Sequence, residues 1–337
     1  MAIDFTGALT LADQAILSND PLVKEITKSL HQTWNAIKDI PFYTSPQLSQ
    51  KGVRYTNEAG TIPTPTWSAI NSEPNAVKGK PKSYEEQMYL IRNKITIDKR
   101  LLDQQNTIVD PVEAQVKIFM EGFAYDFNDK YINNDPTSAA SGNSPDCFPG
   151  LKYRLEHAAD YDIPSDCLVA PASGVASLDT TSSYNALEAN GVISAIQELF
   201  DNMNTPDGDG VVLYMNEETK RRIEFLIRQL GAGTGFNTDV DAFDRTVDKY
   251  KGATVRTVGR KLNGTTPVIT APTNFNDIYA VRYGTGYVQG WQSGPFKPEY
   301  LGKSAENGIM HNILFDWGMG LWMPHTRSIG RLRLATN

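Results

Sequence analysis

One stretch constrains the fold more than any other: residues 110–133 carry the longest uninterrupted helical pattern in the chain. Asp110 is placed to cap the first turn, Pro111 suits the first helical position, and Glu113 completes a capping box. Large apolar side chains recur every three or four residues and share one face, namely Val112, Val116, Phe119, Phe123, Phe127 and Tyr131. We predict a helix about 35 Å long that buries this face and ends at the turn formers of residues 133–136.

The composition is that of a folded protein without a general attraction for polyanions. The chain has 337 residues, 40% hydrophobic and 21% charged, enough for two domains or for one domain with excursions. A formal net charge of −7 argues against a nucleic-acid binder that works through overall charge. An acidic average is still compatible with a locally neutral or basic face, and thus with nucleic acid as enclosed cargo.

The cysteines and the N-terminal residues indicate a protein made in a reducing compartment. Cys147 and Cys167 form no CxxC pair, so no disulfide framework or thiolate metal site is expected, and whether they meet across subunits stays open. Residues 1–20 lack the basic start and apolar run of a signal peptide, and no run of about eighteen apolar residues predicts a membrane span. We expect a soluble protein without a membrane partner.

Residues 1–50 look least like a folded domain. A helical pattern opens at Asp20 and Pro21, and Pro41 and Pro46 interrupt the chain after it. One face of this pattern is apolar and consists of Val23, Ile26, Leu30, Trp34 and Ile37. Nothing nearby in the sequence covers that face. It either packs back on the body of the protein or lies on a neighbouring subunit.

Residues 51–98 predict one long hairpin with a loose tip. Residues 53–56 and 67–70 are short strand candidates, and residues 88–98 return as a strand. The tip, residues 71–83, is polar and carries the lysines Lys78, Lys80 and Lys82. These lysines either meet acidic groups across a subunit boundary or keep an exposed loop soluble. Because two arms with few large apolar residues cannot form a core, we expect the hairpin to lie on a partner.

The rest of the chain predicts helices and strands in mixed order, without the strict alternation of a doubly wound sheet. A loop over residues 138–150 precedes a short amphipathic turn or helix at residues 151–159 and helices at residues 185–203 and 217–230. Strands are expected at residues 211–215, 253–258, 267–270, 278–283, 287–291, 311–322 and 327–334, with a break over residues 301–310. Arg327, Arg331 and Arg333 give the last strand a basic face. That face is turned toward nucleic acid or a neighbour's carboxylates, or it belongs to a plain half-buried strand.

No motif predicts catalysis. HExxH, GxSxG and the Walker phosphate loop are absent, and the four histidines are scattered. The glycine-rich residues 231–235 follow a helix instead of opening one, which favours a surface loop over a phosphate site. Residues 207–210 lack the later ligands of a calcium loop and predict a turn. We expect no catalytic residue, no cofactor and no metal site.

Several segments, taken in order, resemble the major capsid proteins of tailed bacteriophages, which share the Hong Kong 97-like capsid fold. LTLADQAILSND, residues 9–20, resembles the N-terminal arm, and residues 62–71 resemble the extended loop. FAYDF through INNDP, residues 123–136, with FPGL at residues 148–151, is similar to the end of the spine helix and the turn after it. WGMGLW and the residues that follow, 317–332, resemble the closing strands.

The resemblance implies an α+β fold in five parts. These are an N-terminal arm (1–50), an extended β-hairpin loop (51–98), a peripheral domain with the long spine helix (99–170), an axial α/β domain (171–302) and peripheral closing strands (303–337). It also implies a non-enzymatic subunit that assembles in the host cytoplasm, as pentamers and hexamers, into an icosahedral virion head. That head would enclose double-stranded DNA without sequence specificity, with a separate scaffolding protein, a portal and a decoration protein as further partners.

The resemblance and the residue patterns together give a set of candidate subunit-interface residues. They are Trp34, Trp67, Lys78, Lys80, Lys82, Arg327 and Arg331. Two other hypotheses stay open. One is an encapsulin-type nanocompartment shell protein with the same fold, and the other is a soluble α+β enzyme with an unrecognised site.

Overall fold

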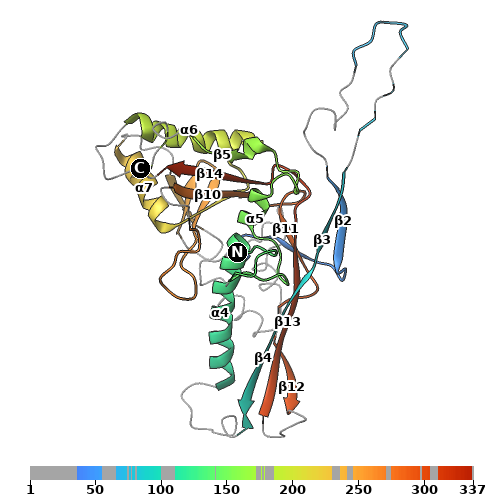
Figure 1. Cartoon of the computed structure of the whole chain (residues 1–337), viewed down its shortest axis with the longest axis vertical. Coiled ribbons are helices and arrows are strands. Elements are labelled where there is room, and N and C mark those ends of the chain that lie inside the picture. The colour runs from blue at the N-terminus through green and yellow to red at the C-terminus, as the bar shows by residue number, and fades with distance from the viewer. Residues whose placement is uncertain are drawn as a thin grey trace.

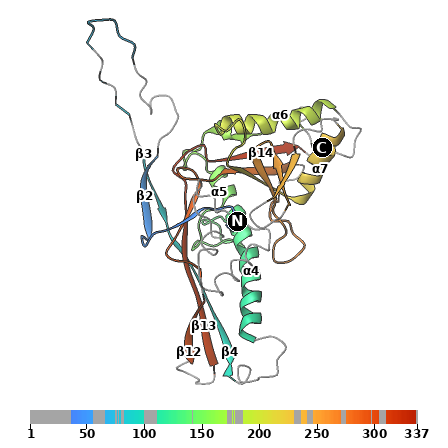
Figure 2. The same cartoon turned by 180° about the vertical axis from the view of Figure 1, so that it is seen from behind.

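The structure is a computed structural model of the 337-residue chain. It describes residues 36–54, 66–73, 76, 78–79, 82–99, 111–140, 142–171, 176, 178, 186–229, 236–240, 246–270, 275–296, 298–303 and 310–335. Figures 1 and 2 show an elongated molecule, with a sheet and two helices at one end and a long helix beside long strands below it. A two-stranded hairpin projects from the side of the body.

The long helix is present as α4, Pro111–Asn133. Within its predicted apolar face, Val116, Phe123, Phe127 and Tyr131 are buried and Phe119 packs against the core. Asn134 follows the helix and fixes the loop after it, because its side-chain amide donates hydrogen bonds to three carbonyls of residues 144–148. The loop predicted over residues 138–150 is confirmed where it is described. The cap predicted at Asp110 lies outside the described residues.

A five-stranded sheet packs against α4. Its strands are β1 (Phe42–Thr44), β11 (Gln289–Gln292), β13 (Met310–Trp322), β12 (Pro298–Lys303) and β4 (Tyr89–Asp98). β13 is the centre, paired antiparallel with β4 along its length, with β12 on its first half and with β11 on its second half. Aromatic rings join the layers: Phe119 lies 4.3 Å from Phe315, and Phe123 lies 6.0 Å from Trp317, between ring centroids.

A seven-stranded mixed sheet forms the other half of the molecule. In spatial order its strands are β5 (Leu168–Val169), β14 (Ile329–Ala335), β10 (Phe275–Arg282), β6 (Val211–Met215), β9 (Ala253–Thr257), β8 (Thr246–Tyr250) and β7 (Phe236–Val240). β6 is buried at every residue and lies between parallel β9 and antiparallel β10. The predicted helices α6 (Ala186–Asn202) and α7 (Glu217–Gln229) are confirmed, and α6 runs across the sheet (Figure 1).

The predicted hairpin is correct in outline and wrong in extent. β2 (Ser49–Arg54) pairs antiparallel with β3 (Lys82–Gln87), but β4 leaves the hairpin and pairs with β13 instead. Residues 67–70, predicted as a strand, are irregular and end in a turn. The reason is burial: β13 brings Ile91 and Ile95 of β4 against the core and buries Ile97, whereas the described residues 66–73 of the outgoing arm are all exposed.

Other strand predictions need smaller corrections. Residues 267–270 form no strand: Pro267 makes one isolated bridge to Arg260 and has no amide hydrogen to continue a ladder. The break expected over residues 301–310 is wrong at its start, where β12 continues to Lys303. The two closing strands are confirmed, yet they lie in different sheets.

Three short helices complete the described chain: η1 (Ala36–Lys38), α5 (Leu151–Glu156) and η2 (Ser165–Cys167). α5 lies within residues 151–159, for which a turn or a helix was predicted. The helical pattern that opens at Asp20 lies outside the described residues up to residue 35, but its last apolar residue, Ile37, is fully buried in η1.

Candidate functional site at the hairpin

The longest described segment between β2 and β3, residues 66–73, is exposed to solvent. Every residue of the described segment 66–73 is exposed, including two large apolar side chains, Trp67 at 98% and Ile70 at 95%. Leu48 and Val53, near the start of the hairpin, are also exposed. Large apolar side chains that are this exposed are often found on a surface that meets another molecule. The hairpin is therefore the candidate interaction site of this chain.

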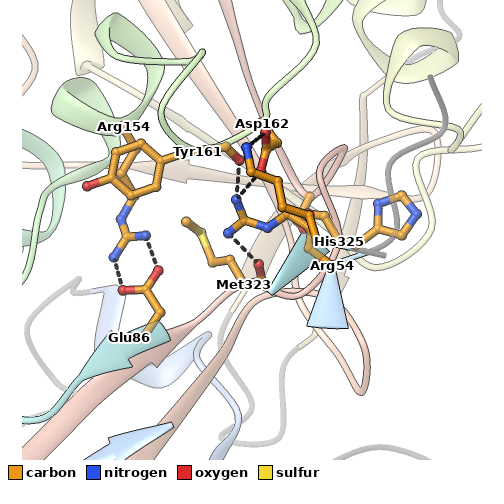
Figure 3. A network of polar contacts seen from close by, with 9 residues as sticks. Arg54, Glu86, Arg154, Tyr161, Asp162, Met323 and His325 are labelled. Atoms are coloured by element: carbon orange, nitrogen blue, oxygen red, sulfur yellow. Dashed lines mark hydrogen bonds and ion pairs between the residues drawn. The ribbon is translucent and has the colours of Figure 1, made fainter. Parts of the chain in front are cut away.

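A buried ion pair holds β3 to the body (Figure 3). Arg154 of α5 donates one hydrogen bond of 2.6 Å and one of 3.2 Å to the two carboxylate oxygens of Glu86. Its Nε donates a third, of 3.0 Å, to the Pro149 carbonyl, and its guanidinium lies 4.9 Å from the centre of the Tyr161 ring. Burial by itself lowers the pKa of Arg154, but the charge and hydrogen bonds of Glu86, together with Tyr161 and Tyr89, raise that pKa by more in total, so the guanidinium stays charged.

A second ion-pair cluster holds both strands where their pairing ends. Arg54 and Lys82 are opposite each other in the register, and both bind Asp162, with N–O distances of 3.3 Å and 2.5 Å. Arg54 is 3% exposed and also donates to the carbonyls of Tyr161 and Met323 (Figure 3). One carboxylate thus fixes both strands, and these contacts set the direction in which the hairpin leaves the body.

Close packing also holds this end of the hairpin against the body. Tyr84 of β3 stacks on Trp322 of β13 with ring centroids 4.4 Å apart. A Cβ at Gly52 would lie 2.6 Å from the Trp322 ring, so only glycine lets β2 pass so close to it. We call the contacts of Arg54, Lys82, Glu86, Arg154 and Asp162 the hairpin root.

The predicted interface residues that the structure describes separate into three groups. Trp67 and Lys78 are exposed in the connection of the hairpin. Lys82 begins β3 and binds Asp162, and Arg327 pairs with Asp166 at 2.7 Å, so each has a carboxylate of its own chain. Arg331 is partly buried on β14, opposite Tyr279. Trp34 and Lys80 lie outside the described residues.

The hairpin root was not predicted from the sequence, and neither was the partner of the basic last strand. Arg333 forms two hydrogen bonds of 2.7 Å with Asp277, a carboxylate only 1% exposed. The only local signal was a lone acid at the start of an apolar strand, Asp277 before Ile278. Glu86, Arg154 and Asp162 carried no local signal, because their partners are far away in the sequence.

A second buried polar network connects α4 with the seven-stranded sheet. The hydroxyl of Tyr283 lies 2.5 Å from that of Tyr131 and 2.9 Å from that of Tyr214, and Tyr214 donates to Asp39 at 3.0 Å. Arg256 completes the network with an ion pair of 3.0 Å to Asp39. Burial raises the pKa of all three tyrosines, so their hydroxyls stay protonated. The adjoining cavity holds about 10 Å³, room for one water at most. This network is structural.

The two cysteine thiols are weakly reactive. Cys147 and Cys167 are free thiols, and burial raises their pKa to about 11 and about 12. Thiols with such pKa values are poor nucleophiles at neutral pH. Among the described residues, no group of His, Cys, Asp and Glu side chains is arranged to hold a metal ion. None of the helices in the described part of the chain has the length and hydropathy of a membrane span.

The sequence matches no protein-family model and no curated protein. Its fold is similar to that of solved shell structures. A chain of an encapsulin complex from Synechococcus elongatus PCC 7942 has a TM-score of 0.55 at 10% identity, covering 98% of this chain and 95% of that one. The capsid of a native GTA particle has a TM-score of 0.54 at 14% identity, covering 92% and 91%.

A phage structure extends this comparison. A chain of Mycobacterium phage Bobi has a TM-score of 0.53 at 10% identity and covers 98% of this chain and 99% of that one. The shared architecture spans nearly the whole length in each case, so the match is not to one common sheet or hairpin. The chain therefore has the Hong Kong 97-like capsid fold, in agreement with the resemblance of its sequence to the major capsid proteins of tailed bacteriophages.

Proposed function

We propose that this protein is the major capsid protein of a tailed bacteriophage, a non-enzymatic subunit of an icosahedral shell. Subunits associate as pentamers and hexamers, assemble in the host cytoplasm and enclose double-stranded DNA without sequence specificity. The observation that carries this proposal is the exposed hairpin with Trp67 and Ile70, on a fold shared with shell-forming chains. A closed shell repeats each modest contact many times, so weak interfaces give a stable particle.

In this proposal the two sheets are the two domains of the subunit. The seven-stranded sheet with α6 and α7 is the axial domain, and the five-stranded sheet with α4 is the peripheral domain. β14 comes after the boundary expected at residue 303, but it lies in the seven-stranded sheet, whereas β13 lies in the five-stranded sheet. In this proposal residues 303–337 therefore contribute to both domains. Residues 1–50 are the arm, and the hairpin is the extended loop that lies on an adjacent subunit.

The proposal includes further partners. A separate scaffolding protein directs assembly, a portal occupies one vertex, and a decoration protein binds outside. DNA is held by enclosure and not by charge attraction, in keeping with the net charge of −7.

The test is negative-stain microscopy and size-exclusion chromatography of the purified protein. We expect rings or shells from the wild-type chain. Replacing Trp67 and Ile70 together by serine is expected to abolish shells while the unassembled chain keeps its unfolding midpoint, because both side chains are exposed. Phe225→Ser, which replaces an exposed apolar residue of α7, is the matched control. A monomer at every protein concentration, above all one with enzymatic turnover, contradicts the proposal and favours a soluble enzyme.

An encapsulin-type shell is the second candidate. It is favoured by the TM-score of 0.55 over 98% of this chain with the Synechococcus encapsulin complex. The contents of particles isolated from the native source separate the two candidates. Double-stranded DNA, and a gene beside portal and terminase genes, support the phage head. A protein cargo, and a gene beside that of a cargo enzyme, support the encapsulin.

A further inference from the structure

A groove runs along the face of α4 that the core does not use. Its volume is about 780 Å³, and the loop after β9 forms its other wall. Residues that line it include Ile118, Gly122, Tyr125, Asn128, Arg260 and Leu262. Ile118 and Leu262 are 64% and 71% exposed, so the groove has large apolar side chains on both walls without cover from the described residues.

The walls of the groove are held in place. Lys261 of the loop pairs with Asp129 of α4 at 3.0 Å, and the Asn133 side chain donates a hydrogen bond of 2.7 Å to the Val268 carbonyl. The groove is thus a built feature between two fixed elements and not the gap beside a loose loop.

Gly122 lies between Ile118 and Tyr125 on the α4 wall of the groove. A glycine inside a helix costs about 1 kcal/mol relative to alanine and usually has a packing reason. A Cβ at this position would touch no described atom within 4 Å. Contacts among the described residues therefore do not require the glycine, whereas close approach of a segment from another molecule does.

The hairpin carries a pair of uncovered apolar side chains that matches the pair in the groove. Trp67 and Ile70 are 98% and 95% exposed. The backbone amide and the hydroxyl of Ser72 both donate to the Ala69 carbonyl, at 3.1 Å and 2.8 Å, and close a turn that contains Ile70. Because this turn is already formed, binding through Ile70 costs less conformational entropy.

The charged side chains beside the two surfaces are complementary in sign. Glu73 is exposed next to the turn, and Arg260 on the groove wall is exposed without a carboxylate partner among the described residues. Lys78, which is also exposed in the connection of the hairpin, is opposite in charge to Glu121 and Glu217, which line the groove. Opposite charges at the rim of a contact favour the correct partner and its orientation.

The hairpin and the groove belong to different copies of the chain. The hairpin and α4 lie on opposite sides of β13, and the hairpin projects away from the body (Figures 1 and 2). Trp67 therefore does not reach the groove of its own chain. A contact between two different surfaces of identical chains passes from each copy to the next, and it closes into a ring when the rotation between copies allows.

A second cleft, beside β4, fits the hairpin less well. Its volume is about 390 Å³, and Arg92, Asp126 and Lys130 are among its lining residues. Of its described lining residues, the large apolar one that is exposed is Leu90, at 47%. Covering this cleft would remove charged side chains from water and bury little new apolar surface. The groove on α4 is therefore favoured.

We propose that Trp67 and Ile70 of one chain dock in the groove of a second copy, against Ile118 and Leu262. This inference rests on the proposed function, because it identifies the surface of the adjacent subunit on which the hairpin lies. Repeated from copy to copy, the contact joins subunits head to tail within one ring.

The test is a disulfide between Ser68→Cys and Glu121→Cys in assembled particles, in a chain whose Cys147 is replaced by serine. Both substitutions keep the four apolar side chains of the contact. We expect a ladder of covalent oligomers on a non-reducing gel, because each copy carries both halves of the contact. A mixture of the two single variants should stop at the dimer. The matched control is Ser68→Cys with Glu299→Cys, at an exposed glutamate of β12, and it should stay uncross-linked.

Two outcomes of this experiment overturn the inference and leave the proposed function standing. One is a particle that forms without a cross-link to residue 121. The other is a disulfide between Ser68→Cys and the native Cys147, which lines the cleft beside β4 and would place the hairpin there. A chain that never associates overturns both the inference and the proposed function.

A second measurement blocks the groove. Gly122→Arg fills it without weakening α4, since arginine is the better helix former. We expect the protein concentration at half assembly to rise by about tenfold, with the unfolding midpoint of the unassembled chain unchanged. Gly294→Arg is the matched control, because its Cβ also meets open space but lies outside the groove. Equal assembly of the two variants contradicts the docking of the hairpin in the groove.

Discussion

Arg154 and Glu86 are joined by two hydrogen bonds, of 2.6 Å and 3.2 Å, in a site where their side chains are only 1% and 10% exposed. The pair connects α5, in the body of the protein, with β3, one strand of the projecting hairpin. Since a buried ion pair requires close geometry, it admits one orientation of the hairpin root. Contacts within the chain therefore fix the orientation at which the hairpin would meet another surface.

Removing one partner of this pair is expected to destabilise the chain strongly. Arg154→Met leaves Glu86 buried without its counter-charge, which lowers the free energy of unfolding by about 3–5 kcal/mol. Lys51→Met is the control on the same hairpin, because Lys51 pairs with Glu85 at 75% and 44% exposure. The control is expected to change stability by less than about 1 kcal/mol. Chemical denaturation measures both, and equal effects contradict the role given to the buried pair.

Asp162→Asn is expected to loosen the hairpin root without altering the turn that holds it. Asp162 has a φ of 54°, a conformation that asparagine adopts as readily as aspartate. The substitution removes the charge that binds Arg54 and Lys82, so the amide hydrogens of β2 and β3 should exchange faster. Glu85→Gln, which disrupts only the exposed pair with Lys51, is the control. If amide hydrogen exchange is unchanged in Asp162→Asn, the backbone hydrogen bonds between β2 and β3 are sufficient to hold the hairpin root, and the role given to Asp162 is wrong.

Gly320→Ala is expected to destabilise the five-stranded sheet. A Cβ at this position would lie 2.5 Å from the buried Trp291 ring, which has no room to move aside. Overpacking of this kind costs about 1–3 kcal/mol. Gly294→Ala, whose Cβ meets open space, should leave the free energy of unfolding nearly unchanged. Thermal denaturation of the two variants makes the comparison, and a stable Gly320→Ala chain contradicts the close packing of Trp291.

His325 is expected to make stability depend on pH. Burial, then the charges of Arg282 and Arg327, lowers the pKa of this imidazole, which also contacts the Tyr287 ring. Its Nδ1 accepts a hydrogen bond of 3.1 Å from the Arg327 amide, which only the ring without a proton on Nδ1 can do. The unfolded chain therefore binds the proton more readily than the folded chain does. Its stabilising effect is complete above the unfolded pKa of about 6.5 and declines as the pH falls toward the lower folded pKa.

Denaturation series between pH 5 and pH 8 measure this dependence. His325→Asn keeps an acceptor for the Arg327 amide and removes the titrating ring, so the decline near pH 6 should become shallower. His157→Asn, at an exposed position, is the control and should leave the decline as it is. A wild-type stability that rises as the pH falls through 6 has the opposite sign and contradicts the account.

The elements that sequence periodicity identified are those whose burial is regular along the chain. α4 repeats apolar residues at helical spacing, and β6 is an apolar run that is buried on both faces. Such patterns depend on neighbours in sequence, so they can be recognised without the fold. β12 and the pairing of β4 were missed because an edge strand and a choice between partners depend on which surface is available, and no local pattern records that.

The sequence by itself determined that the chain has a long buried helix, a polar hairpin without a core of its own and a mixed α+β order, since each follows from local residue spacing. Only the tertiary structure decided that β4 pairs with β13, that β13 and β14 belong to different sheets and that Arg154 meets Glu86. The physical reason is distance along the chain. Arg54 and Asp162 are 108 residues apart, and a carboxylate so remote leaves no trace in the residues around the arginine.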